Sequence, residues 1–171
     1  MRDNLIVVNL SGVDVNLQNL IVATLLDLYY AQMHGGQKPK QSANGHRAIT
    51  NMFLVDEADN FLSQNYDSLR KLLKEGREYG VGAILSTQGL DHFKTDLNDY
   101  SVYMAGYCIH RLENPKASMV ASVFNQTDKA TQNKTLSQVR ELEKHHSLLI
   151  DGKKQITYQE STAFWKLIEN K

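Results

Sequence analysis

Two adjacent carboxylates, Asp56 and Glu57, come directly after the apolar residues 52–55. A buried strand is stiff, so it would hold both side chains in fixed positions. An aspartate placed in this way can bind Mg²⁺, often through water, beside the phosphates of a nucleotide, and the neighbouring glutamate can orient and deprotonate an attacking water. This is the Walker B pattern. An acid pair after a strand is also a common helix cap or turn, and both interpretations stay open on these residues alone.

Gln88 stands at the end of the next predicted strand, one helical connection after the acid pair. Right-handed connections place successive parallel strands side by side or one apart, so Gln88 can face Glu57 across a cleft. An amide there can sense a γ-phosphate or position water, and we expect the adjacent Thr87 to help bind the nucleotide. The alternative is a polar residue in an ordinary turn.

Arg77 is a basic candidate near the end of a predicted helix. From there it could reach the nucleotide of a neighbouring subunit as an arginine finger. A solvated or ion-paired surface arginine is the alternative. Arg111, next to His110, is a second basic candidate, for which a surface role is favoured.

The elements that must position these residues alternate between apolar runs and amphipathic segments. We expect strands at residues 5–10, 51–55, 83–87 and 102–109, helices at 16–33, at 67–79 and from Pro115, a mobile loop at 34–47, and a closing hairpin of 147–150 with 155–158. The strands are apolar on both faces, which is typical of an α/β domain with a mainly parallel sheet. In such sheets functional residues gather at the carboxyl ends of the strands, where the acid pair and Gln88 both lie.

Three segments together resemble the HerA/FtsK superfamily of hexameric DNA translocases. They are Leu54-Val55-Asp56-Glu57-Ala58, the helix end Glu75-Gly76-Arg77-Glu78-Tyr79-Gly80, and the strand end Ser86-Thr87-Gln88. The resemblance continues through the hairpin at 148–153. Residues 5–10, 16–20 and 163–167 look most like the C-terminal part of the DptH-type ATPase of phosphorothioation-dependent DNA restriction systems.

The resemblance implies a RecA-like, mainly parallel sheet flanked by helices and ending in a C-terminal hairpin, as one partial ATPase domain over residues 1–171. It implies that Asp56 assists Mg²⁺ through water, Glu57 is the catalytic base, Gln88 is the sensor, and Arg77 is a finger acting in trans. ATP and Mg²⁺ are the implied cofactors of an ATP-dependent DNA translocase or helicase. DNA, further copies in a hexamer and other restriction-system proteins are the implied partners.

The phosphate-binding loop of such ATPases, Gly-x-x-x-x-Gly-Lys-Ser/Thr, does not occur in the sequence. In the family it lies well before the Walker B strand, so we expect the P-loop strand to be missing from the sheet. Backbone amides and the lysine of that loop make most phosphate contacts, so the chain is expected to be active only when the loop is supplied. Strands beside the gap would expose their edges, which predicts low stability or self-association.

Composition sets the remaining limits. The 19 basic and 19 acidic residues cancel, so no bulk charge draws the chain to nucleic acid or membrane. The single cysteine, Cys108, is expected to be a buried thiol and fits a cytoplasmic protein, and no stretch has the length and apolar character of a membrane span.

Two other functions stay open. One is a DEAD-box-like helicase, whose motif residues 56–59 spell, although Ser86-Thr87-Gln88 departs from the Ser-Ala-Thr of that class. The other is a non-catalytic, ATPase-derived subunit that binds a partner.

Overall fold

The computed structural model describes residues 5–163 and residue 166. Residues 1–4 lie outside this range. Residues 164, 165 and 167, which belong to the 163–167 segment that resembles the DptH-type ATPase, also lie outside it. The described residues form two compact units. The first comprises residues up to 54 together with 63–84, and the second comprises residues 55–62 together with those from 85 onward.

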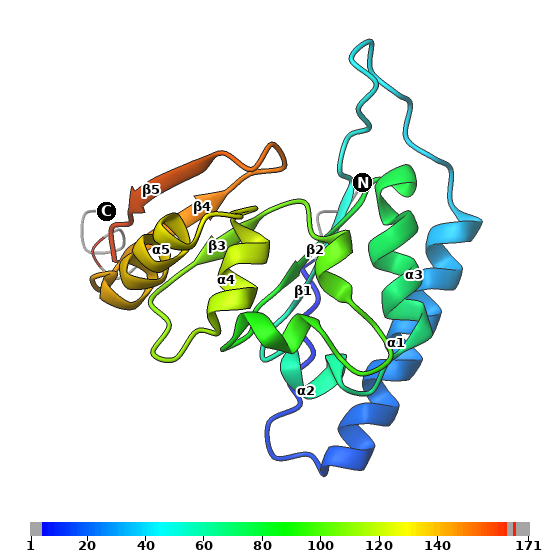
Figure 1. Ribbon diagram of the computed structural model, residues 1–171. Coiled ribbons are helices and arrows are strands. Elements are labelled where there is room, and N and C mark those ends of the chain that lie inside the picture. The colour runs from blue at the N-terminus through cyan, green and yellow to red at the C-terminus, as the bar shows by residue number, and fades with distance from the viewer. Residues whose placement is uncertain (1–4, 164–165, 167–171) are drawn as a thin grey trace. The chain divides into compact units, whose positions relative to one another are not determined.

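A long helix, α1 (Val15–Gly35), dominates the first unit. Asp14 caps its start, because the Asp14 carboxylate accepts hydrogen bonds from the backbone amides of Asn16 (2.9 Å) and Leu17 (3.4 Å). α1 lies along α3 (Asp67–Glu75), which the 3-10 turn η1 (Gly76–Tyr79) continues (Figure 1). The helices predicted at 16–33 and 67–79 are therefore confirmed, the second with a tighter last turn.

Two strands, β1 (Asn51–Val55) and β2 (Val81–Leu85), form a two-stranded sheet. They run parallel, because the Thr50 amide donates to the Gly80 carbonyl at their start (2.8 Å) and the Ser86 amide donates to the Val55 carbonyl at their end (2.9 Å). The strand predicted at 51–55 is confirmed, and the one predicted at 83–87 starts earlier than expected. Gly82 is the second residue of β2. A Cβ at this position would lie 2.8 Å from the sulfur of Met52 on β1, so the site suits glycine.

One face of this sheet is covered and the other is bare. Phe53 of β1 packs its ring edge-on against Tyr29 of α1, with ring centroids 5.8 Å apart. Side chains alternate along a strand, so Met52 and Leu54 point to the opposite face. They are 54% and 65% exposed, and Ile84 of β2 is 49% exposed. The expectation of strands buried on both faces is therefore wrong for β1 and β2.

The strand predicted at residues 5–10 is absent from the structure, which has no regular secondary structure there. Leu5, Ile6 and Val7 are between 77% and 90% exposed. An apolar, β-branched run becomes a strand only when another strand satisfies its backbone, and the sheet described for this unit ends at β1 and β2. Residues 5–10 therefore have the composition of a buried strand, but their backbone pairs with no neighbouring strand in the described residues.

The connection predicted as a loop at 34–47 begins later, because His34 and Gly35 belong to α1. Residues 36–50 lie outside helices and strands, apart from an isolated bridge between Gln41 and Arg47. The mobility of this segment stays a prediction.

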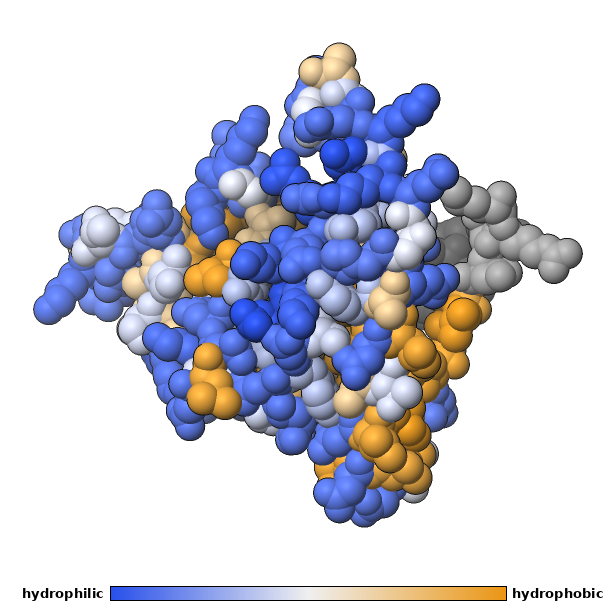
Figure 2. Space-filling view, turned by 90° about the vertical axis from the view of Figure 1, so that its right-hand side faces the viewer, coloured by the Kyte–Doolittle hydropathy of each residue, from blue (hydrophilic) through white to orange (hydrophobic). Residues whose placement is uncertain are grey.

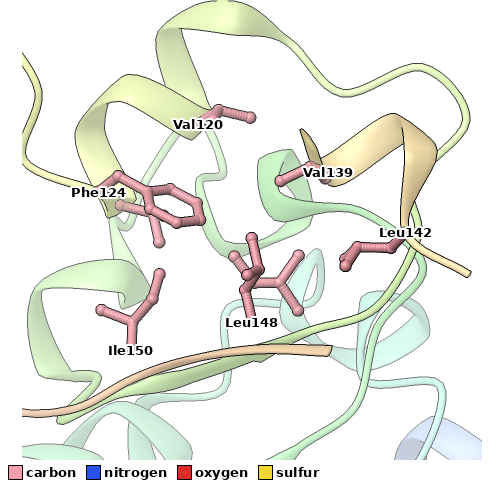
Figure 3. Packing of buried hydrophobic residues seen from close by; sticks show 8 residues of the cluster. Val120, Phe124, Val139, Leu142, Leu148 and Ile150 are labelled. Carbon is pink, nitrogen blue, oxygen red and sulfur yellow. The ribbon is translucent and has the colours of Figure 1, made fainter. Parts of the chain in front are cut away.

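The second unit contains an antiparallel sheet in the order β3 (Tyr107–Ile109), β4 (His146–Ile150) and β5 (Ile156–Glu160). The predicted closing hairpin is therefore confirmed. Figure 1 shows α4 (Ala117–Val123) and α5 (Lys129–Glu141) on one face of this sheet. Residues of the α4 and α5 region and of β4 form its core, as Figure 3 shows: Val120, Phe124, Val139, Leu142, Leu148 and Ile150.

Several boundaries in this unit differ from the predictions. Of the strand predicted at 102–109, only the last part forms, because Asp99 caps a 3-10 turn, η3 (Tyr100–Tyr103), that buries Tyr100 completely. The helix predicted from Pro115 begins at Ala117. The sequence does not predict α5, since its residues are mostly polar.

Cys108 is exposed rather than buried. Its side chain follows the alternation of β3, whose next residue, Ile109, points into the core and is 4% exposed.

The structure is therefore α/β, as predicted, with a small parallel sheet and a separate antiparallel hairpin sheet. Within the described residues β2 and β3 each pair on one side alone, as β1 and β5 also do, and the loss of a neighbouring P-loop strand stays a prediction. No helix in this part of the chain has both the length and the apolar character needed to cross a membrane.

Candidate functional site

The chain turns sharply directly after β1, at the acid pair. Glu57 has a φ of 49°, in the left-handed region that side chains other than glycine rarely adopt and that costs of order 1–3 kcal/mol. Two hydrogen bonds hold the turn: the Ala58 amide donates to the Ser86 carbonyl at 2.7 Å, and the Glu57 amide donates to Asp56 Oδ1 at 3.1 Å. Ala58 is 1% exposed, so the turn is anchored in the second unit while the carboxylates of Asp56 and Glu57 stay exposed.

Gln88 meets Glu57 directly. The Gln88 side-chain amide donates to Glu57 Oε2 at 3.0 Å, and both residues are exposed. The contact results from the fold, because the carboxyl ends of two neighbouring parallel strands lie at the same edge of the sheet. This hydrogen bond orients the carboxylate and leaves the second carboxylate oxygen and the amide oxygen of Gln88 able to bind water.

Thr87 lies in the same turn but faces its own neighbours. Its hydroxyl is 2.9 Å from the Gly89 carbonyl and 2.8 Å from His92 Nδ1, and it accepts a hydrogen bond from the Gly89 amide at 3.1 Å. No hydrogen bond joins it to the acid pair within the residues described. The structure thus brings together Asp56, Glu57 and Gln88, and places the Thr87 hydroxyl beside His92.

A polar cavity of about 420 Å³ opens beside Gln88, between the segments that come after β2 and β3. An ion pair between Asp91 and Lys116 (2.8 Å) joins the two segments, and the Lys116 ammonium lowers the pKa of Asp91 below its ordinary value. The exposed Arg111 also lines the cavity. Sequence reasoning missed Asp91, His92 and Lys116; the available signal was charged residues at short spacing after two strands.

Arg77 belongs to the first unit, in η1. Both flanks of this turn are held: His34 Nε2 lies 3.1 Å from Glu75 Oε2, and the Tyr79 hydroxyl lies 3.0 Å from His34 Nδ1. Hydrogen bonds from His34 and Tyr30 lower the pKa of Glu75. Arg77 is exposed, and its guanidinium makes no hydrogen bond or ion pair with the residues that the structure describes. The turn is therefore fixed while the arginine is available to another molecule.

The carboxylates fit part of a magnesium site. Mg²⁺ prefers oxygen ligands and is usually held by one or two carboxylates, with water and substrate phosphates completing its shell. Asp56 and Glu57 can supply these, and buried Asp59 Oδ1 beside them has no hydrogen-bond partner among the described residues. No group of three or more His, Cys, Asp or Glu side chains in that part of the chain could hold a metal alone. The donor set thus suits Mg²⁺ that arrives with a nucleotide.

No protein-family model matches the chain, and no curated protein matches it. Solved structures do match, and one is VirB4 of Thermoanaerobacter pseudethanolicus, with a TM-score of 0.61 and 12% sequence identity. The alignment covers 92% of this chain and 41% of that one. The chain has the fold of part of VirB4. At this identity the likeness shows the fold alone. Membership of the HerA/FtsK superfamily therefore stays a prediction, and the narrower DptH-type match receives no support from this comparison.

Proposed function

We propose that this chain is the Walker B and sensor half of a P-loop ATPase motor, and that a segment carrying the phosphate-binding loop completes the site from outside these residues. The hydrogen bond between Glu57 and Gln88, at the carboxyl ends of two parallel strands, carries the proposal. It joins a candidate base and a candidate sensor that lie on separate turns.

The two side chains have complementary roles in hydrolysis. Glu57 would orient and deprotonate the attacking water, and Gln88 would hold the Glu57 carboxylate until a γ-phosphate offers it a new partner. Asp56 would hold bound Mg²⁺ through water; the ion would neutralise phosphate charge. The adjacent polar cavity, with Arg111 and Lys116 on its wall, leaves room beside Gln88 for phosphate oxygens.

The bare face of the β1–β2 sheet supports the proposal that a segment outside these residues packs on it. Phe53 of β1 packs against Tyr29 of α1, and α1 lies along α3, so these helices lie toward the face of the sheet that bears Phe53. Met52, Leu54 and Ile84 on the opposite face are between 49% and 65% exposed. Further apolar side chains are exposed on α1, and Figure 2 shows apolar atoms gathered toward one end of the face that this unit presents. Exposed apolar surfaces are typical of interaction sites, and a P-loop strand with its helix has the chemistry to cover the bare face of the sheet.

A more specific proposal concerns the substrate that the motor moves and the assembly in which it acts. The Glu75–Gly80 and Ser86–Gln88 segments resemble those of HerA/FtsK translocases, so we propose DNA as the substrate that is moved, a ring of copies with Arg77 acting in trans, and a role in DNA restriction or defence. The available guanidinium of Arg77 on a fixed turn suits this arrangement.

The test uses the assembly that the chain forms in its own cell. An affinity tag on the genomic copy allows purification, and Mg²⁺-dependent ATP hydrolysis is then measured for wild type and Glu57→Gln. Loss of the base should lower the rate by about 10²-fold or more with ATP binding kept. Glu141→Gln, which removes an exposed carboxylate at the end of α5, outside the lining of the cavity, is the matched control and should change the rate little. Full activity of Glu57→Gln would contradict the proposal.

A non-catalytic subunit is the second candidate, and the exposed apolar surface is the observation that favours it. In that case the purified assembly would form normally, and neither Glu57→Gln nor Gln88→Ala would change any ATP hydrolysis that accompanies it.

A further inference from the structure

The connection between α1 and β1 contains a folded hairpin, residues 37–48, which we name the basic arm. An isolated β-bridge pairs Gln41 with Arg47, and the Ser42 amide donates to the His46 carbonyl at 2.7 Å. Figure 1 shows this segment as a narrow excursion that projects beyond the C-terminal end of α1. Its shape is therefore set by internal hydrogen bonds.

The base of the arm is fixed to the turn that bears Arg77. Lys38 Nζ lies 2.7 Å from Glu78 Oε2 and 4.6 Å from the centre of the Tyr79 ring. Gly80 packs so closely that a Cβ there would lie 2.6 Å from the Ala48 carbonyl oxygen and 2.7 Å from Pro39 Cγ. The arm and η1 are thus one local assembly.

Positive charge gathers on the arm although the whole chain is neutral. No aspartate or glutamate occurs between Asp27 and Asp56, whereas Lys38, Lys40 and Arg47 all lie there. Lys40 is exposed and makes no ion pair with the described residues. The Arg47 guanidinium donates to a backbone carbonyl of the arm, that of Pro39, and lies near enough to Glu78 to help lower the pKa of that carboxyl. Three cationic side chains of the arm thus face one carboxylate, which leaves the arm with a net positive charge.

The other side chains of the arm decide which acidic partner it fits. Protein interfaces need large aromatic or aliphatic anchors at their centre, and the largest apolar side chain between residues 37 and 48 is Pro39. Glutamine, serine, asparagine and backbone amides, beside lysine and arginine, are instead the groups that contact nucleic-acid phosphates. We propose that the basic arm contacts the phosphate backbone of DNA. This inference rests on the proposed function as a DNA motor and gives that substrate a place on the chain.

The test is binding of a short fluorescent DNA duplex to the full chain, measured by anisotropy at several salt concentrations. The double variant Lys40→Gln/Arg47→Gln should bind more weakly than wild type at about 50 mM salt and should lower the slope of log affinity against log salt by about 2. Between about 50 and 200 mM salt, wild type should therefore lose about 16-fold more affinity than the variant loses. Lys129→Gln/Lys134→Gln is the matched control, because it removes the same charge from exposed positions of α5. It should leave the slope unchanged.

Arg47→Lys separates charge from folding of the arm. It keeps the positive charge, so it should keep the salt slope if phosphate contact is the role of Arg47. No duplex binding by wild type at low salt, or the same slope for both double variants, would overturn the inference. Tighter binding of poly-glutamate than of DNA would also overturn it and assign the arm to an acidic protein. ATP hydrolysis by the tagged assembly separates this inference from the proposed function. Loss of hydrolysis in Glu57→Gln would support the proposed function whatever the DNA-binding result is, and the arm variants should keep hydrolysis.

Discussion

The two compact units bury their apolar residues to very different degrees. In the second unit, α4, α5 and β4 close around side chains such as Val120, Val139 and Ile150, each fully buried. In the first unit, α1 is 21 residues long and buries Met33 alone among its described side chains, while Leu20 and Leu28 are more than 60% exposed. The second unit contains its own hydrophobic core, whereas the first unit leaves many of its large apolar side chains exposed.

Polar contacts hold the first unit together where apolar packing is thin. α1 is joined to α3 and its neighbours through the Tyr30 hydroxyl and His34, which both contact Glu75, and through the Tyr66 hydroxyl, which donates to the Asn19 carbonyl. Polar contacts near the surface contribute much less to stability than a buried aliphatic side chain, which contributes several kcal/mol. The comparison therefore predicts different responses of the two units to substitution, pH and partners.

The largest effect is expected in the core of the second unit. Ile150→Ala removes a fully buried side chain and should lower the free energy of unfolding by about 2–5 kcal/mol in urea melts. Ile156→Ala is the matched control, because it alters the same residue type at the position paired with Ile150, where the side chain is 48% exposed. Equal losses in the two variants would show that this unit has no core of its own.

A smaller effect is expected where the basic arm meets η1. Gly80 has a φ of 70° and has no space for a Cβ, so Gly80→Ala should destabilise the first unit by about 1–3 kcal/mol and speed hydrogen exchange in the arm. Gly35→Ala, with nothing within 4 Å of the added methyl group, should change little. Unchanged hydrogen exchange of the basic arm in Gly80→Ala would contradict the structural coupling of the arm to η1.

Acid should weaken the first unit through Glu75. Its pKa is lowered on folding, so its contribution is present above the ordinary value of 4.5 and is lost as the pH falls through the folded-state pKa. The stability difference between wild type and Glu75→Gln should therefore be constant near neutral pH and shrink toward zero in acid. Asp96→Asn, at an exposed site without a hydrogen bond or ion pair to the described residues, serves as the control in the same pH series. A difference that grows on acidification would contradict this account.

The smallest effect on the chain alone is expected on the bare face. Leu54→Asn should change the free energy of unfolding by less than about 0.5 kcal/mol, because the side chain is 65% exposed. The same variant should lower recovery of the tagged assembly if another segment covers this face. A loss of several kcal/mol in the isolated chain would show that the face is buried already.

The sequence was informative where pattern and pairing agree. The strand at 51–55, the long α1 and the closing hairpin are predicted by local apolar patterns, and the approach of Glu57 and Gln88 is predicted by parallel strands that end at one edge. The strand expected at residues 5–10 did not form, because strand formation depends on a partner that the run itself cannot specify. α5 and the cavity beside Gln88 escaped prediction, since both depend on tertiary packing of polar segments.

The central claim is that the Glu57–Gln88 site is completed by a phosphate-binding segment that covers the bare face of β1 and β2. A photo-crosslinking amino acid in place of Leu54, in the tagged assembly, tests this most directly. The predicted result is a crosslinked peptide from a segment that carries Gly-x-x-x-x-Gly-Lys-Ser/Thr, with no such crosslink when the same amino acid replaces Leu97, which is 77% exposed in the second unit. Crosslinks from the Leu54 position only to proteins without that motif would contradict the account.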